Sequence, residues 1–202
     1  METVYSFTAD AYGHANDATY NPNTGKVYVV SMLATGEVYE LDPANSMALN
    51  RTLYTVDENG NAVKVWAIAW DRKRSRYITF DTTPALRTYD ASFNLLSTKA
   101  LTSDGLLSVW PTTRQGMETD GDFLYLISYD TSQINITDMD LNPVKVLPLG
   151  VTTEPEALAF DWNTGMMFGT DWSSSAKTSI RLLMFKKHAP EAYVEAFNSL
   201  AT

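Results

Sequence analysis

Apolar and polar residues alternate in short runs along most of the chain, a pattern typical of β-strands rather than helices. The alternation is clearest at residues 27–29 and 133–136. Segments rich in Asn, Asp, Gly, Pro and Ser separate the runs, and these residues favour turns. The pattern therefore predicts an all-β protein made of many short strands.

Four segments of the chain repeat one layout. Each has a strand of small and apolar residues, then an Asn or Asp that opens a turn, then a second strand rich in aromatic residues. The turn-opening residues are Asn21, Asp71, Asp120 and Asp161, which are 50, 49 and 41 residues apart. A four-stranded blade of a β-propeller takes about 40–50 residues. The repeat therefore predicts a single small β-propeller with four recurring blade units.

The remaining strands of each blade can also be read from the pattern. We expect third strands at residues 36–42, 85–91, 133–140 and 179–186, and fourth strands at residues 52–56, 95–100 and 144–149. The last unit has no obvious fourth strand, and residues 189–202 are expected to form a tail or short helix after a propeller of residues 1–188. The strand-like residues 3–8 are expected to complete this blade and close the ring, because an open ring exposes sheet edges. A five-bladed ring and a β-sandwich are the alternatives.

Charge and composition narrow the possible partners. A formal net charge of −9 argues against nucleic acid. One basic cluster, Arg72, Lys73, Arg74 and Arg76, falls in a turn, where we expect solvated side chains, with a phosphate contact as the alternative. The chain lacks cysteine, and with it disulfides and thiolate metal sites. No apolar run approaches the ~20 residues that cross a membrane, and the N-terminus does not resemble a signal peptide.

One repeat position indicates where a ligand would bind. This position, two residues before the middle of each first strand, carries Asn16, Trp66, Gln115 and Glu156, and the nearby polar residues are His14, Lys64, Arg114 and Glu154. First strands line the central channel of a propeller, so these side chains are expected to converge. They offer hydrogen-bond donors and acceptors, cations and an aromatic face, which suit a sugar or another small polar ligand. The alternative is that they satisfy the channel backbone and one another.

Catalysis is the less favoured hypothesis, and we expect no catalytic residue, no metal and no cofactor. Glu154 and Glu156 lie two apart on a strand, so they point to one face and could support acid–base chemistry or hold a cation. A metal-assisted hydrolase or lactonase using this pair with Asn16 and His14 is the alternative function. The Asp-Gly-Asp of residues 120–122 is explained by a tight hairpin turn.

Most aromatic residues are expected to pack between blades. Tyr28, Tyr77, Tyr125 and Phe168 recur on the second strands. Trp110 and Trp172 fall in segments expected to connect blades, where they either project a contact surface or lie buried under a loop.

Residues 13–29 resemble the opening unit of a group of small β-propeller proteins from Gram-positive bacteria and their phages, often near tail or cell-wall-directed proteins. Residues 67–71, 89–93, 115–118 and 154–159 keep the resemblance, which covers roughly residues 13–185. It implies a propeller in a virion or on a cell surface.

The leading hypothesis is thus a non-enzymatic interaction or recognition module. It would be a phage tail or fibre component that binds another structural protein or a bacterial surface glycan, without membrane insertion. Homo-oligomerisation, a cytoplasmic location and an intracellular scaffold without a small ligand stay open.

Overall fold

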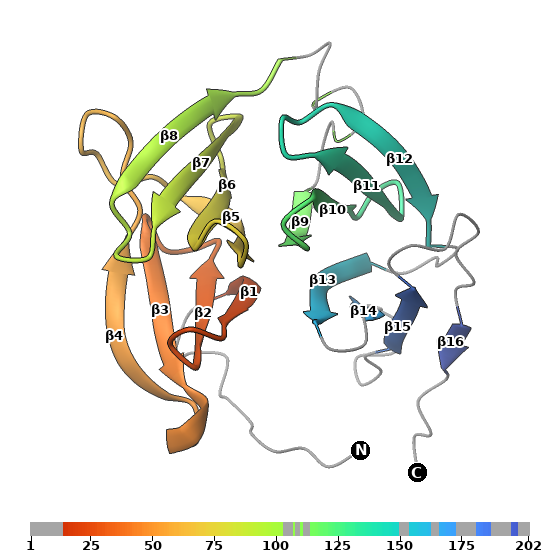
Figure 1. Ribbon diagram of the computed structural model, residues 1–202, viewed down its shortest axis with the longest axis horizontal. Coiled ribbons are helices and arrows are strands. Elements are labelled where there is room, and N and C mark those ends of the chain that lie inside the picture. Colours follow the sequence, from red (N-terminus) through yellow and green to blue (C-terminus); the bar gives the residue numbers. More distant parts are fainter. Residues whose placement is uncertain are drawn as a thin grey trace. The chain divides into compact units, whose positions relative to one another are not determined.

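The computed structural model describes residues 14–102, 107, 110, 114–149, 154–162, 166–172, 181–186 and 195–197. The chain divides into two compact units, Met1–Ala100 (unit 1) and Leu101–Thr202 (unit 2). The described residues form four antiparallel sheets of four strands each, two in either unit (Figure 1). The predicted all-β architecture with four repeated sheets is confirmed.

Unit 1 contains the sheets β1-β2-β3-β4 and β5-β6-β7-β8. The strands are β1 (Ala15–Asn21), β2 (Lys26–Ser31), β3 (Glu37–Asp42), β4 (Ala48–Tyr54), β5 (Val65–Asp71), β6 (Arg76–Asp81), β7 (Ala85–Asp90) and β8 (Leu95–Ala100). The strand β4 begins before the expected residues 52–56, because a short 3-10 helix, η2 (Pro43–Asn45), already turns the chain. Asp42 caps this helix by accepting a hydrogen bond from the backbone nitrogen of Ala44 at 3.0 Å.

Unit 2 contains the sheets β9-β10-β11-β12 and β13-β14-β15-β16. The strands are β9 (Arg114–Thr119), β10 (Phe123–Ser128), β11 (Gln133–Asp138), β12 (Pro143–Pro148), β13 (Glu154–Asp161), β14 (Met166–Trp172), β15 (Arg181–Lys186) and β16 (Glu195–Phe197). Within the described residues, no helix is long and apolar enough to cross a membrane.

The outer strand of the last sheet differs from expectation. The sequence suggested a tail or short helix over residues 189–202, whereas Glu195–Phe197 form β16 and pair with residues 182–184 of β15. Pairing satisfies backbone groups along the edge of β15, and this need outweighs the weak helical preference of a short Glu- and Ala-containing segment. Residues 3–8, which were expected to supply this strand, lie outside the described residues.

The first turn of three sheets has the predicted side-chain chemistry. In each, the turn-opening Asn or Asp accepts a hydrogen bond from the backbone nitrogen two residues on, as such residues do in Asx turns. The three bonds run from Asn23 to Asn21 at 2.9 Å, from Lys73 to Asp71 at 3.1 Å and from Asp122 to Asp120 at 2.8 Å.

A second loop recurs that the sequence reading missed. Residues 57–61, 90–94 and 138–142 all have the form Asp-x-x-x-Asn, and the Asp accepts two backbone N–H groups and the Asn side-chain amide. The residue before the Asn has a positive φ and is Gly60, Phe93 or Leu141. Phe93 and Leu141 are buried, so their packing offsets the cost of a left-handed backbone at a non-glycine residue.

An aromatic core joins the two sheets of unit 1. Tyr28, Trp70 and Tyr77 are fully buried, and the ring centroid of Tyr77 lies 4.8 Å from that of Tyr28 and 4.6 Å from that of Trp70. Phe93 stacks on Tyr77 at 4.4 Å. Burial of each such ring stabilises the fold by roughly 1.5–3 kcal/mol.

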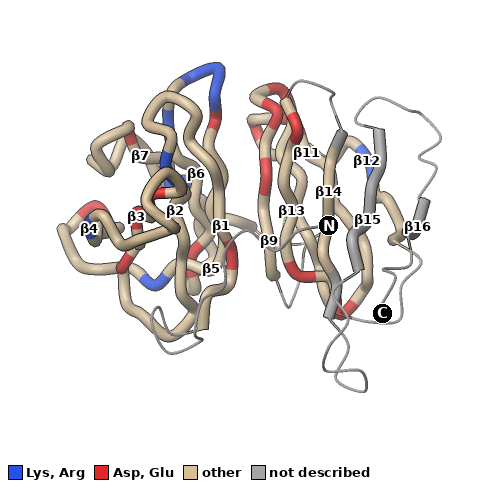
Figure 2. Tube along the Cα trace, turned by 90° about the horizontal axis from the view of Figure 1, so that it is seen from below, with Lys and Arg blue, Asp and Glu red and all other residues tan. Residues whose placement is uncertain are grey.

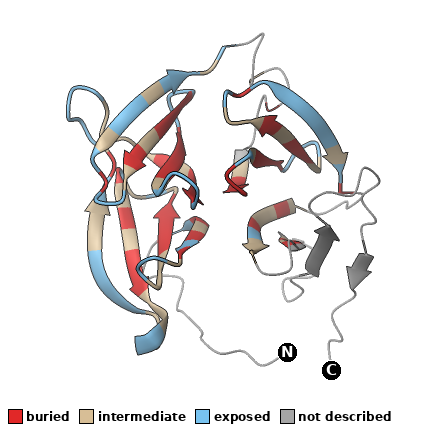
Figure 3. Cartoon of the chain, in the orientation of Figure 1, coloured by how far each residue is buried: buried red, intermediate tan, exposed pale blue. Residues whose placement is uncertain are grey.

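The core of unit 2 is built in the same way, with Tyr125 of β10 meeting Phe160 of β13 edge to face at 5.0 Å. Tyr28, Tyr77 and Tyr125 are buried as expected, and Phe168 is half-buried. Outer strands β4, β8 and β12 are largely exposed (Figure 3).

The two connecting-segment tryptophans differ from each other. Trp110 is fully buried, and its Nε1 donates to the carbonyl oxygen of Ile127 at 2.7 Å. It therefore packs rather than projects a surface. Trp172 belongs to β14, and its side chain lies outside the described part of the chain.

Candidate functional site

Each first strand carries a β-bulge at one and the same repeat position. The register shifts between Ala15 and Asp17 in β1, between Val65 and Ala67 in β5, between Arg114 and Met117 in β9, and between Pro155 and Leu158 in β13. The first residue inside each shift is the one that the repeat singled out: Asn16, Trp66, Gln115 and Glu156. We call this the bulge position. A bulge turns a side chain out of the normal pleat, and bulges are frequent beside binding sites.

In unit 1 the bulge position is occupied by a structural contact. The side-chain amide of Asn16, which is buried, donates from Nδ2 to the carbonyl oxygen of Trp66 at 2.6 Å. The bulge residue of the first sheet, Asn16, is thereby hydrogen-bonded to the backbone of the bulge residue of the second sheet, Trp66. Asn16 therefore fits the alternative prediction, in which the polar side chains of the repeat form hydrogen bonds with the backbone. Because its amide is used in this contact, Asn16 is no longer a candidate ligand-binding residue.

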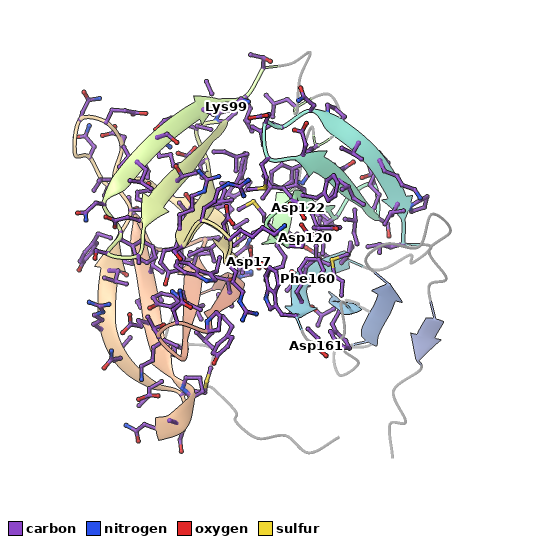
Figure 4. All side chains as sticks on the ribbon, viewed as in Figure 1. Asp17, Lys99, Asp120, Asp122, Phe160 and Asp161 are labelled. Atoms are coloured by element: carbon purple, nitrogen blue, oxygen red, sulfur yellow. The ribbon has the colours of Figure 1, made fainter. Side chains whose placement is uncertain are left out.

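Two further side chains of β1 hold the backbone of β5. Asp17, labelled in Figure 4, accepts from the backbone nitrogen of Ile68 at 2.9 Å, and Thr19 accepts from that of Trp70 at 3.1 Å. All four groups are buried. The side chains take the place of a neighbouring strand for N–H groups that β6 does not reach. We call Asn16, Asp17 and Thr19 the unit 1 clamp.

In unit 2 the bulge position joins side chains to one another. Gln115 of β9 donates from one nitrogen, Nε2, to Glu154 Oε1 at 2.8 Å and to Glu156 Oε2 at 3.2 Å. All three side chains are partly exposed. Gln115 is the one described residue that donates a hydrogen bond to either carboxylate. We call these three residues the Gln–Glu cluster.

The electrostatics of this cluster are unusual for a protein surface. Burial, and secondly the charge of Glu154, raise the pKa of Glu156 to about 7. A neutral amide cannot balance two carboxylates, and among the side chains that the structure describes no Lys or Arg forms an ion pair with them. Residues 101–202 as a whole have 13 Asp and Glu against six Lys and Arg. The cluster therefore favours hydrogen-bond donors and cations over anions.

His14 and Lys64 come directly before the first strands of the two sheets of unit 1. The backbone carbonyls of His14 and Lys64 accept from Met32 and Thr82 at 3.0 and 3.1 Å, so these residues occupy equivalent places in their sheets. The side chain of His14 is exposed and that of Lys64 half-exposed. The side chain of Arg114 lies outside the described part of the chain.

Trp66 is the remaining candidate in unit 1. Its ring is partly exposed, and its buried Nε1 has no hydrogen-bond partner among the described residues. An indole N–H without a partner costs free energy in the unliganded protein. Trp66 thus offers an aromatic face and a donor, and Asn16 orients the backbone that carries it.

Asp17 and Thr19 are the residues that sequence reasoning missed. Both are polar residues at positions where the second and fourth repeats carry Ala. Polar residues in a strand whose equivalents in other repeats carry Ala could have identified these two positions from the sequence.

Metal chemistry gains little support from the described geometry. No group of three His, Cys, Asp or Glu side chains among the described residues is placed to hold a metal ion. Asp120 and Asp122 flank Gly121 in the β9–β10 turn (Figure 4), where Asp120 accepts from the backbone and from the hydroxyl of Tyr125 at 3.0 Å. The hairpin turn explains this motif, as predicted.

Comparisons with known proteins identify a fold. No family model matches the chain, and no curated protein matches it. Glutaminyl cyclase of Myxococcus xanthus matches with a TM-score of 0.62 at 12% identity, over 91% of this chain and 74% of that one. The structure of U3-55K matches with a TM-score of 0.54 at 12% identity, over 91% of this chain and 51% of that one. Hydrazine synthase of Kuenenia stuttgartiensis matches with a TM-score of 0.53 at 9% identity, over 95% of this chain and 52% of that one.

The chain spans about half the length of the U3-55K and hydrazine synthase structures. At such low identity the likeness shows the fold alone. All three are β-propeller proteins, and the chain accordingly has an all-β, propeller-like fold. The number of blades and the closure of the ring stay predictions.

Proposed function

We propose that this chain is a non-enzymatic recognition module that binds a polar, hydroxyl-rich ligand of the glycan class. The observation that carries the proposal is the bulge position of unit 2, where one amide of β9 binds two carboxylates of β13. These groups are partly exposed, and the hydrogen bonds that the two carboxylates accept come from Gln115 rather than from the backbone. They therefore stand ready for a ligand in a way that the unit 1 clamp does not.

The chemistry of the Gln–Glu cluster fits sugar hydroxyls. Each carboxylate has one oxygen that accepts from Gln115 and one oxygen to which no described residue donates a hydrogen bond, and a carboxylate oxygen accepts strongly from a hydroxyl. A protonated Glu156 could also donate, since its pKa of about 7 leaves both forms populated near neutral pH. An anionic ligand would meet two carboxylates and is disfavoured.

Trp66 is proposed as a separate aromatic contact within unit 1. Aromatic rings bury large apolar area at low entropic cost, and the indole N–H donates to a hydroxyl or carbonyl oxygen. The partial exposure of Trp66 supports this role.

The proposed setting is a phage tail or fibre assembly, with a bacterial surface glycan as ligand and another virion protein as neighbour. Its support is the resemblance of residues 13–29 and the later segments to small propellers of Gram-positive bacteria and their phages. Mass spectrometry of a purified virion that encodes the chain tests this setting, and absence of the chain from the particle contradicts it.

Retention on immobilised bacterial cell-wall polysaccharide tests the binding proposal. Replacing Glu154→Gln and Glu156→Gln together is expected to weaken retention by about tenfold, because charge-assisted hydrogen bonds are lost while side-chain shape is kept. Trp66→Phe is expected to weaken it less. Asp140→Asn, an exposed carboxylate of the same unit, is the matched control. Equal retention of the double variant and the wild type would contradict the proposal.

A metal-assisted hydrolase or lactonase is the second candidate, favoured by the pKa of Glu156 near the operating range of a general base. Ester and lactone hydrolysis, with and without added divalent cations, tests it. An activity whose pH profile inflects near pH 7 and is lost in Glu156→Gln would replace the binding proposal.

A further inference from the structure

Two turns of unit 1 have one geometry and very different sequences. In the β1–β2 and β5–β6 turns, Asn21 and Asp71 each accept the N–H two residues on. The last turn residue has a positive φ in both, 69° at Gly25 and 50° at Ser75. Residues 22–25 read Pro-Asn-Thr-Gly, whereas residues 72–75 read Arg-Lys-Arg-Ser.

The basic version is the less favourable turn. Glycine adopts a positive φ without the Cβ penalty that serine incurs, and three successive cations repel one another. Pro-Asn-Thr-Gly makes a turn with the same Asx hydrogen bond in the same unit, and Arg74 is used by the buried Asp71, so the fold does not require Arg72 and Lys73. Residues that do not suit their local backbone conformation are found mainly at functional sites.

The cations are exposed on a rigid support. Arg72, Lys73 and Arg74 are exposed, and Figure 2 shows them as a long blue stretch of the tube. Asp71, which is buried, accepts the backbone N–H groups of Lys73 and Arg74 and pairs with Arg74 and Arg76 at 3.1 Å each. A turn fixed in this way loses little entropy when it binds.

We propose that the β5–β6 turn is a docking element for an acidic segment of a partner protein. The guanidinium group of Arg72 matches a carboxylate in a two-pronged geometry, and the Lys73 ammonium adds a second exposed positive charge. A chain of net charge −9 repels an extended polyanion such as nucleic acid. A short acidic segment, by contrast, can engage one turn within the screening length of about 8 Å. This surface is separate in residues and chemistry from the Gln–Glu cluster, so either proposal can fail without the other.

Fluorescence anisotropy of a labelled peptide of alternating Asp and Glu is the direct test. Wild-type protein is expected to bind it at low salt and to release it at about 0.3 M salt, where exposed charges are screened. Arg72→Asn with Lys73→Asn, which leaves both ion pairs of Asp71 in place, is expected to weaken binding about fivefold or more. Lys99→Gln with Lys145→Gln removes the same charge elsewhere and is the matched control.

A turn-swap variant guards against misfolding. Asp71→Asn, Arg72→Pro, Lys73→Asn, Arg74→Thr and Ser75→Gly together install the Asn-Pro-Asn-Thr-Gly turn that unit 1 already uses between β1 and β2. No buried carboxylate is then left without its ion pairs, so the variant should fold and lose peptide binding. Peptide binding that is absent in the wild type, or unchanged in the turn variants, overturns the proposal. Tighter binding of a short DNA duplex than of the acidic peptide overturns it in favour of a polyanion.

Discussion

The two units place different chemistry on the same backbone feature. In unit 1, the bulge residue Asn16 is buried and binds the backbone of the next bulge residue, Trp66. In unit 2, Gln115 reaches past the backbone to the side chains of Glu154 and Glu156. A difference of one methylene between Asn and Gln accompanies this change from a side chain–backbone bond to a side chain–side chain network.

The comparison separates structural polar residues from functional candidates. The unit 1 clamp satisfies the N–H groups of Ile68 and Trp70 from a neighbouring sheet. At the equivalent positions of unit 2, Gly116 and Glu118 stand in place of Asp17 and Thr19. Unit 1 thus uses Asp17 and Thr19 to hold two sheets together, whereas in unit 2 the buried Glu118 accepts from the backbone nitrogen of Thr119 and the partly exposed polar groups are those of the Gln–Glu cluster.

Loss of the clamp carboxylate should have the largest effect. Asp17→Ala leaves the buried N–H of Ile68 without an acceptor, and we expect the free energy of unfolding to fall by about 2–3 kcal/mol in urea titrations. The amide proton of Ile68 should exchange faster with solvent. Asp17→Asn keeps an accepting oxygen and should cost clearly less. A loss below about 0.5 kcal/mol for Asp17→Ala would show that the clamp is dispensable.

The pH dependence of stability should report the Gln–Glu cluster. The folded-state pKa of Glu156 is raised from 4.5 to about 7. Stability from this group is therefore fully present below about pH 4.5 and is lost as the pH rises through about 7. Because Glu156 is partly exposed, we expect a loss of up to roughly 2 kcal/mol.

Glu156→Gln should remove this slope and be more stable than the wild type at pH 8. Groups whose pKa is lowered, such as Glu40 beside Arg51, change stability in the opposite direction and at lower pH. The difference curve between wild type and variant isolates Glu156. Parallel curves would mean that Glu156 does not titrate near neutrality.

A smaller effect is expected at the second member of the clamp. Thr19→Val keeps the shape of the side chain and removes the acceptor for the backbone nitrogen of Trp70, at a cost of about 1 kcal/mol. Amide exchange at Trp70, compared with that at Ile68 in the same variant, shows whether the loss is local. Equal acceleration at both sites would indicate a general loosening of the contact between β1 and β5.

The smallest effect should come from converting the unit 2 arrangement toward that of unit 1. Gln115→Asn shortens the amide by one methylene, so its nitrogen should lose at least one carboxylate. We expect the pKa of Glu156 to rise and stability at pH 8 to fall by about 0.5–1 kcal/mol. An unchanged Glu156 titration would show that the amide does not stabilise the carboxylates.

The repeat was the part of the fold that sequence could predict. The turns that open at Asn21, Asp71 and Asp120 could be predicted because an Asn or Asp side chain forms its hydrogen bond locally, with the backbone two residues on. The Asp-x-x-x-Asn loops were missed because Phe93 and Leu141 at a positive φ contradict local preference, and tertiary burial decides their conformation. The strand β16 was missed for a similar reason: the edge of β15 specifies it, rather than its own three residues.

The sequence predicted which positions of the repeat are equivalent, but not which contacts their side chains make. Counting along the repeat identified the bulge position, since equivalent residues occupy equivalent places in their sheets. Whether a polar group there binds backbone, as Asn16 does, or another side chain, as Gln115 does, depends on its reach and its neighbours. The hydrogen-bond partner lies on a strand far away in the chain, so the sequence around the polar residue does not indicate which partner it binds.

The titration of the glutamate side-chain carboxyl groups, followed by NMR in glutamate-labelled protein, tests the contrast between the units most directly. The account predicts one carboxyl with a midpoint near pH 7, absent in Glu156→Gln and displaced in Gln115→Asn, and untouched by Thr19→Val in the unit 1 clamp. Titration of every glutamate below about pH 5, as in ordinary solvated carboxyl groups, would contradict it.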